Sequence, residues 1–308
     1  MENIATTVDP SVTAAFTLLK AHPDYRILQR LEIRSNFDAG SGGPTGIAAV
    51  IDTETTGTNQ GQDKIIEVGI VRFEFEVESG RLLRIVDVYS GLEDPGFAIP
   101  PESTEIHGIT DEMVSGKQLD EQRIAAIMQG VTLVIAHNAS FDRPFLESRM
   151  PLFANLPWGC SLEQIPWSEE GFRGAKLEYL CWVSGFFYDA HRSEVDCRAL
   201  LELLRKPLPK SGTTGLQRLL EAASEPALRL WATGSPFDTK DVLRERGYRW
   251  EATRRCWHRV VPKAVAKDES EWLKAAVYGG RAAQIEVEVL DSRLRFSGRP
   301  GPRKPRVI

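Results

Sequence analysis

Four acidic side chains and one histidine, spread between positions 52 and 196, constrain the fold and chemistry of this chain more than any other feature. They stand in three short stretches: VIDTETTG at 50–57 with Asp52 and Glu54, AHNASFDRPFL at 136–146 with Asp142, and HRSEVDCRALLELL at 191–204 with His191 and Asp196. A strand that carries Asp-x-Glu presents both carboxylates on one face, because strand side chains alternate. Two further carboxylates arriving from helices would complete an acidic cluster.

Such a cluster needs compensating positive charge. At an effective dielectric constant near 20, two carboxylates about 4 Å apart repel each other by roughly 4 kcal/mol. Two divalent cations would balance four carboxylates, which predicts a two-metal site of the kind that cleaves phosphodiesters. Because carboxylate oxygens are the ligands that Mg²⁺ and Mn²⁺ prefer, we expect two of these ions, held by Asp52, Glu54, Asp142 and Asp196.

Three of the four candidate ligands have a purely structural alternative. Asp52 would cap the turn after its strand, and Asp142 would lie favourably in the first turn of a helix that starts at Ser140. Asp196 would complete a capping box in which Ser193 is the N-cap. The presence of all three stretches in one chain favours metal binding over these alternatives.

His191 is the candidate general base. An imidazole with a pKa near 6.5 suits proton removal from water at neutral pH. If the helix that carries Asp196 begins at Ser193, His191 lies on the preceding loop and can turn toward the same site. An exposed loop histidine without a catalytic role is the alternative.

The order and context of the three stretches resemble the DEDDh exonucleases, above all the epsilon subunit of bacterial DNA polymerase III and its free-standing relatives. The segments KIIEVGIVRF at 64–73 and EIHGITDEMV at 105–114 match as well, so that the resemblance covers roughly 46–206. It implies the ribonuclease H-like exonuclease fold. It also implies that Thr53 contacts the terminal 3′ hydroxyl and that Ile106 and His107 flank the terminal nucleotide. For His107, a loop histidine that bonds the backbone is the alternative.

The order of elements predicts an α/β fold, a mixed sheet flanked by helices, because strands come first and then alternate with helices. The expected organisation is a helical N-terminal segment at 1–35, a linker at 36–46, the exonuclease domain at 47–206, a linker and connecting helix at 207–225, a small basic α+β domain at 226–296, and a disordered basic tail at 297–308. Within the N-terminal segment we expect a helix capped by Asp9 and a second helix over 24–33. Within the small domain, we expect hairpins over 248–261 and 283–298.

The first of these hairpins would place Tyr248, Trp250, Trp257 and Arg259 on one face of the sheet. Aromatic residues interleaved with arginines are typical of a surface that binds single-stranded nucleic acid. The alternative is that the aromatic residues form the core of a small domain, which needs large side chains to bury.

Charge is divided unevenly along the chain, whose formal net charge is −5. From Asp241 to the end there are 16 Lys and Arg against 9 Asp and Glu, so that the C-terminal part is basic and the remainder is acidic.

The first twelve residues show no signal-peptide pattern, and the four cysteines form no C-x-x-C pair, which favours a cytoplasmic protein with reduced thiols.

The predicted activity is metal-dependent 3′–5′ hydrolysis of DNA to nucleoside monophosphates, in proofreading or DNA repair. DNA 3′ ends would be the main partner, and a DNA polymerase would be a partner only if the chain is a proofreading subunit instead of a free-standing nuclease. An RNA-trimming exonuclease is the alternative substrate class. A catalytically inactive nucleic-acid-binding scaffold is the alternative outside enzymes.

Overall fold

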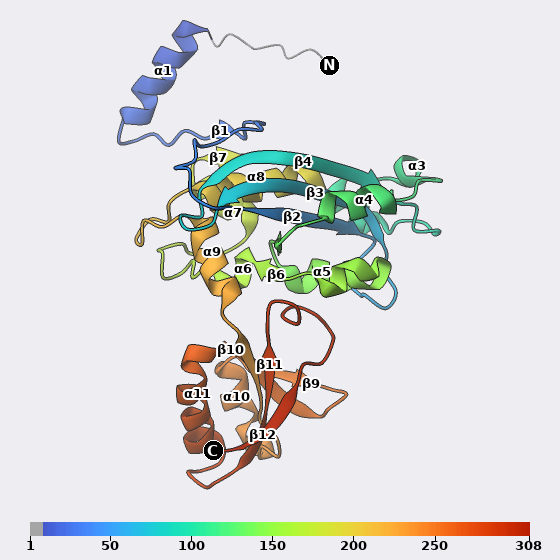
Figure 1. The fold of residues 1–308 in the computed structure, drawn as a ribbon, viewed down its shortest axis with the longest axis vertical. Coiled ribbons are helices and arrows are strands. Elements are labelled where there is room, and N and C mark those ends of the chain that lie inside the picture. The colour runs from blue at the N-terminus through green and yellow to red at the C-terminus, as the bar shows by residue number, and fades with distance from the viewer. Residues whose placement is uncertain (1–8) are drawn as a thin grey trace.

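The computed structural model describes residues 9–308 and contains a mixed α/β domain followed by a smaller domain built on an antiparallel sheet (Figure 1). The main sheet has the strand order β4-β3-β2-β5-β6. Strands β4, β3 and β2 are antiparallel, whereas β5 and β6 run parallel to β2. The predicted mixed sheet with flanking helices is confirmed.

In the first domain, strands come first and then alternate with helices, as predicted, and the short elements α2, α3, α6 and β7 are added to this order. Its elements are β2 (Thr45–Thr55), β3 (Ile65–Glu76), β4 (Leu82–Leu92), α2 (Pro101–His107), α3 (Asp111–Val114), α4 (Glu121–Met128), β5 (Leu133–Ala136), α5 (Ala139–Arg149), β6 (Trp158–Cys160), α6 (Ser161–Gln164), α7 (Leu177–Val183), β7 (Phe186–Phe187), α8 (Ser193–Arg205) and α9 (Gly215–Ser224).

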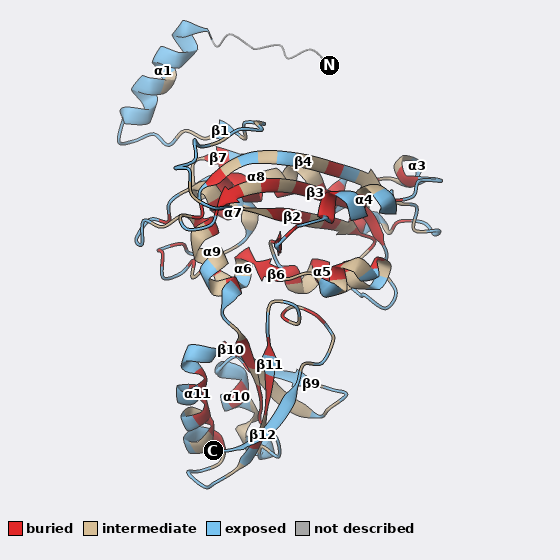
Figure 2. Cartoon of the chain, viewed as in Figure 1, coloured by how far each residue is buried: buried red, intermediate tan, exposed pale blue. Residues whose placement is uncertain are grey.

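Both faces of the main sheet are covered, which explains why β2 and β3 are apolar along most of their length (Figure 2). Alternate residues of β2 enter different cores: Ala48 and Val50 pack in the cluster that contains α8, whereas Ala49 and Ile51 pack in the cluster that contains α4 and α5. Because the side chains alternate, Asp52 and Glu54 continue the face of β2 that α8 covers.

The N-terminal segment differs from the prediction in its second half. Helix α1 (Pro10–Ala21) forms as expected, and the Asp9 carboxylate accepts a hydrogen bond from the backbone N–H of Ser11 at 2.8 Å. The prediction of a second helix over 24–33 is wrong. Strand β1 (Gln29–Arg30) pairs with β7 instead, and the backbone N–H of Leu31 donates to the carbonyl of Phe187. Residues 1–8, where the predicted segment begins, lie outside the described residues.

The segment predicted as the first linker is tied to the sheet edge. The backbone N–H of Phe37 donates to the carbonyl of Leu83 in β4, and β2 already begins at Thr45.

None of the helices in the described part of the chain has the length and apolar character that a membrane-spanning helix requires.

The C-terminal domain is a five-stranded antiparallel sheet with the order β12-β11-β8-β10-β9, with helices packed on one face. Its elements are β8 (Ala227–Trp231), α10 (Lys240–Glu245), β9 (Arg249–Glu251), β10 (Cys256–Pro262), α11 (Ala266–Trp272), β11 (Gln284–Leu290) and β12 (Arg303–Val307). The hairpin of β9 and β10 forms with Trp250 opposite Trp257, as the sequence predicts.

The end of the chain does not follow the prediction. Strand β11 pairs with β12 instead of forming a local hairpin, so residues 303–307 are a strand and not part of a disordered tail. The segment between them, 291–299, lies against the exonuclease domain: Phe296 packs on its core, and the backbone N–H of Trp158 in β6 donates to the carbonyl of Ser292 at 2.7 Å. The hairpin predicted over 283–298 does not form, because residues 291–299 contact the exonuclease domain instead of pairing with β11.

Candidate active site

The acidic cluster begins at the C-terminal end of β2, where Asp52 lies opposite Gly69 and Glu54 lies opposite Glu67 of β3. Helix α8 starts directly over this pair of strands. A Cβ at position 69 would lie only 2.4 Å from the backbone of Ser193 and Glu194, so only glycine allows the helix to approach so closely. This approach brings Asp196, in the first turn of α8, to the face that carries Asp52 and Glu54.

Glu67 holds the start of α8 in place. Its buried carboxylate accepts a hydrogen bond from the backbone N–H of Ser193 at 3.0 Å and pairs with the Arg192 guanidinium at 2.7 Å. The predicted site residues do not include Glu67, although an acidic residue inside the apolar run IIEVGIV is itself a signal of a functional role.

The N-cap predicted for α8 is wrong by one residue. Arg192 is the N-cap, and the Ser193 hydroxyl is buried without a hydrogen-bond partner among the described residues. The backbone N–H of Arg192 instead donates to Asp196 Oδ2 at 3.0 Å, and the Tyr188 hydroxyl donates to Oδ1 at 3.0 Å. The carboxylate of Asp196 is therefore oriented by bonds to both of its oxygens.

Three of the four predicted ligands meet directly. One carboxylate oxygen each from Asp52, Glu54 and Asp196 lies within 4.8 Å of the others, which is close enough for all three to bind one cation. The carboxylates provide only oxygen donors, which fit Mg²⁺ or Mn²⁺ better than softer metals. The residues present therefore fit the divalent cations that the sequence predicts.

Asp142 approaches from α5 and is buried beside the same strand. Its Oδ1 accepts hydrogen bonds from the backbone N–H of Thr53 at 3.0 Å and from the Thr53 hydroxyl at 2.9 Å. Burial raises the pKa of Asp52, and the nearby charge of Asp142 raises it further. Asp142 thus lies beside the cluster without belonging to the three-residue group, and Thr53 acts as its positioning residue, a role that the sequence did not suggest.

Burial and mutual repulsion disfavour the ionised forms of these acids. Burial, together with neighbouring carboxylates, raises the pKa of Asp52 and brings that of Glu54 to about 8. Burial likewise raises the pKa of Asp142 to about 7, although the two bonds from Thr53 act in the opposite direction. For Asp196, burial raises the pKa against the effect of its bond from Tyr188. The ionised carboxylates of the cluster therefore repel one another, and bound cations would relieve this repulsion.

This repulsion predicts how stability depends on pH. Because the folded-state pKa values of Glu54 and Asp142 exceed those of the unfolded chain, the folded state binds more protons, and the cluster destabilises the metal-free protein increasingly as pH rises toward 8. Burial also lowers the pKa of His107, His137 and His258, and these histidines act with the opposite sign, but mostly below pH 6.5, where the imidazoles of the unfolded chain are protonated. The window from pH 6.5 to 8 therefore reports mainly on the carboxylates.

Thermal unfolding in EDTA should therefore show a lower melting temperature at pH 8 than at pH 6.5, and Mn²⁺ should restore more stability at pH 8. Glu54→Gln should flatten the difference in EDTA. A melting temperature in EDTA that rises across this window would contradict the proposed crowding of carboxylates.

The two histidines occupy different environments. His191 lies exposed on the loop before α8, with φ +67°, and α8 begins at Ser193, the position that the sequence predicts. His107, at the end of α2, is buried, and its Nδ1 accepts the backbone N–H of Ile109 at 3.0 Å. Burial lowers its pKa, and its Nε2 has no partner among the described residues. Ile106 is exposed beside it.

A polar hollow of about 470 Å³ lies next to the cluster. It is lined by Glu67, Ser90, Gly91, Leu92, Lys117, Gln118 and Arg192. Because Glu67 faces Glu54 across the two strands and Ser90 pairs with Gly69, the hollow continues the face of the sheet that carries the acids. Two cationic side chains, Lys117 and Arg192, border the hollow, which favours binding of a negatively charged group such as a phosphate.

Comparison with known proteins places this geometry in a family. The model of the exonuclease family RNase_T matches residues 49–204. The DNA polymerase III subunit epsilon of Treponema pallidum is 32% identical over 161 residues, which cover 49% of this chain and 72% of that protein. A DNA polymerase III PolC-type of Clostridium perfringens is 30% identical over 51% of this chain, but the match covers only 11% of that larger protein.

Two solved nuclease structures are similar to this chain over 57% of its length. A structure of Exonuclease X in complex with 5′ overhanging duplex DNA is 29% identical, with a TM-score of 0.43, over 57% of this chain and 98% of that one. The nuclease domain of 3′hExo, a DEDDh family member bound to rAMP, is 18% identical, with a TM-score of 0.43, over 57% of this chain and 97% of that one. The family model and the epsilon subunit decide the assignment: the chain belongs to the RNase_T family of DEDD-type 3′–5′ exonucleases.

Proposed function

We propose that the protein hydrolyses DNA from its 3′ end and releases nucleoside monophosphates, in proofreading or DNA repair. The observation that carries this proposal is the convergence of Asp52, Glu54 and Asp196 within 4.8 Å, with Asp142 bonded to Thr53 beside them. The choice of DNA is supported by the names of the relatives, a DNA polymerase III subunit and PolC-type polymerases.

The proposed roles follow from these positions. Asp52, Glu54, Asp142 and Asp196 would hold two Mg²⁺ or Mn²⁺ ions, which when bound acidify water and stabilise the developing charge on the leaving oxygen. His191, on its exposed loop, would accept the proton from the attacking water.

The substrate strand is expected to enter over α2. His107 would flank the terminal nucleotide. Because its Nδ1 accepts a backbone N–H, the ring proton of the neutral imidazole lies on Nε2, a buried atom. Ile106 would pack against that nucleotide. The hollow bordered by Lys117 and Arg192 would contact a phosphate of the strand.

Digestion of end-labelled substrates tests this function directly. With Mg²⁺ or Mn²⁺, single-stranded DNA and duplex DNA with a mispaired 3′ end should be shortened one nucleotide at a time from the 3′ end, and RNA of the same sequence should be shortened more slowly. Faster digestion of RNA would overturn the choice of DNA. An absence of any stepwise shortening from the 3′ end would overturn the proposed activity itself.

A further inference from the structure

A line of aromatic and basic side chains crosses the surface of the C-terminal domain. We call it the aromatic strip; it consists of Phe237, Lys240, Arg244, Trp257 and Trp250. The Lys240 ammonium lies 4.4 Å from the centroid of the Phe237 ring, and the Arg244 guanidinium lies 6.0 Å from that of Trp257. The rings of Trp257 and Trp250 follow at 5.5 Å, nearly edge to face. The five side chains therefore form one continuous surface.

The secondary structure explains this alignment. Lys240 and Arg244 are four residues apart in α10 and so share one face of the helix. Trp250 and Trp257 are directly opposite each other in the hairpin of β9 and β10 and share one face of the sheet. The contact of Arg244 with Trp257 joins the helix face to the sheet face.

The domain core does not need the outer members of the strip. Tyr248 is the buried aromatic residue of the hairpin, and Trp257 is half-buried against the same core. Phe237 remains 82% exposed and Trp250 50% exposed. The alternative that the hairpin aromatics serve the core therefore holds for Tyr248 and not for Trp250. Arg259, predicted to share the binding face, is paired with the buried Glu269 at 2.9 Å. Arg244 is paired with Asp241 at 2.8 Å, but both side chains are exposed, where such a pair is weak and a phosphate can replace the carboxylate.

Exposed aromatic rings interleaved with cations fit one class of ligand well. Every nucleobase offers a flat face for stacking, worth about 1–3 kcal/mol per base, and the phosphates between bases attract lysine and arginine. A paired duplex hides its bases and cannot stack in this way. The excess of basic residues after Asp241 supplies a field of the matching sign.

We propose that the aromatic strip is a second nucleic-acid site, which binds single-stranded DNA by stacking bases on Trp250 and Phe237 while Lys240 and Arg244 contact phosphates. The site goes beyond the exonuclease activity, because the strip contains none of the acidic cluster; it rests on the proposed function only for the choice of DNA as the strand.

The test is binding of a fluorescently labelled oligothymidylate of about 20 nucleotides to the full chain in EDTA, which prevents hydrolysis, followed by anisotropy. Trp250→Ala should weaken binding about 5- to 150-fold, and Trp250→Phe should retain most of the affinity. The double variant Lys240→Gln/Arg244→Gln should make the dependence of affinity on salt less steep, by about 0.7 per charge on logarithmic axes.

Trp182→Ala is the matched control. Trp182 in α7 is 51% exposed and, like the aromatics of the strip, lies beside a cation, here the guanidinium of Arg26. Its affinity should equal that of the wild type. Equal binding by Trp250→Ala and wild type, or equal weakening by Trp182→Ala and Trp250→Ala, would overturn the proposal.

A second readout separates this site from the active site. The p-nitrophenyl ester of thymidine monophosphate is too small to span the two domains, so Trp250→Ala should hydrolyse it at the wild-type rate with Mn²⁺. If the wild type failed to shorten end-labelled DNA with Mn²⁺ while Trp250→Ala still weakened oligothymidylate binding, the proposed function would fail and the aromatic strip would stand. Slower ester hydrolysis by Trp250→Ala would count against a separate site.

Discussion

Asp52→Asn is expected to lower the rate of nuclease hydrolysis by about 10³-fold, because both proposed cations depend on this carboxylate. The change removes one charge and keeps the shape of the side chain. Since burial and the neighbouring acids raise the pKa of Asp52, the variant should fold and should be at least as stable as the wild type in EDTA. Nuclease rates and thermal unfolding, measured on the same samples, check both expectations.

The matched control for this change is Glu74→Gln in β3. Glu74 pairs with Arg84 at the end of the strand away from the cluster, so its loss should leave the nuclease rate unchanged. If Asp52→Asn kept more than a small fraction of the activity with Mg²⁺, or if Glu74→Gln lost as much, the acidic cluster would not be the catalytic centre.

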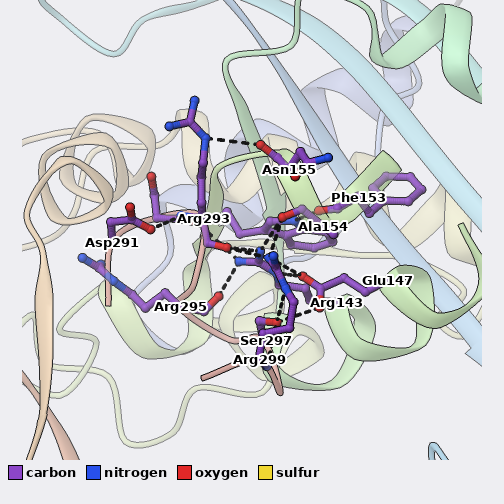
Figure 3. Close-up of polar contacts among 12 residues, drawn as sticks. Arg143, Glu147, Phe153, Ala154, Asn155, Asp291, Arg293, Arg295, Ser297 and Arg299 are labelled. Carbon is purple, nitrogen blue, oxygen red and sulfur yellow. Dashed lines mark hydrogen bonds and ion pairs between the residues drawn. The ribbon is translucent and has the colours of Figure 1, made fainter. Parts of the chain in front are cut away.

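The second large effect concerns Arg143, which follows Asp142 in α5 and is completely buried. Its guanidinium pairs with Glu147 at 2.6 Å. It also donates to backbone carbonyls of the C-terminal segment, those of Ser292, Arg293 and Arg295 (Figure 3). This one side chain therefore joins the helix that carries a proposed metal ligand to the segment between β11 and β12.

Arg143→Met should lower the free energy of unfolding by about 3–5 kcal/mol, because it leaves Glu147 and the carbonyls buried without their partner. Arg218→Met is the control: Arg218 pairs with Glu221 on the exposed surface of α9, where such a pair contributes about 0–1 kcal/mol. Urea unfolding compares the two. Equal losses for both variants would contradict the role of Arg143 as a buried anchor.

This anchor also ties the C-terminal segment to the core of the exonuclease domain. Truncation after residue 225 removes 291–299 together with the small domain, so it exposes part of the exonuclease core around Phe296 as well as deleting the aromatic strip. Weakened binding by a truncated protein would therefore not isolate nucleic-acid contacts. Point substitutions in the strip avoid this problem.

The sequence predicts the main sheet well because its pattern is local and strong. Strands β2 and β3 are long apolar runs, and the turn between β3 and β4 contains Gly80, whose φ of +61° favours glycine. The convergence of Asp52, Glu54 and Asp196 follows from topology, since a helix that starts over β2 and β3 brings its first turn to that face.

What the sequence misses depends on contacts between distant segments. The bond from Thr53 to Asp142 and the pairing of Glu67 with the start of α8 join residues that lie 89 and 126 positions apart. The sequence predicts a basic tail where β12 forms. The partner of this strand, β11, is separated from it by the segment that Arg143 binds, so no local hairpin pattern indicates the pairing. Helix periodicity over 24–33 is likewise overridden by backbone bonds between β1 and β7.

The most direct test of the central claim is the location of Mn²⁺ by anomalous scattering in crystals of the full chain grown with a nucleoside monophosphate. We predict two ions: one bounded by Asp52, Glu54 and Asp196, and a second beside Asp52 on the side of Asp142. A single ion, or ions bound away from Asp52, would contradict a two-metal exonuclease site in this chain.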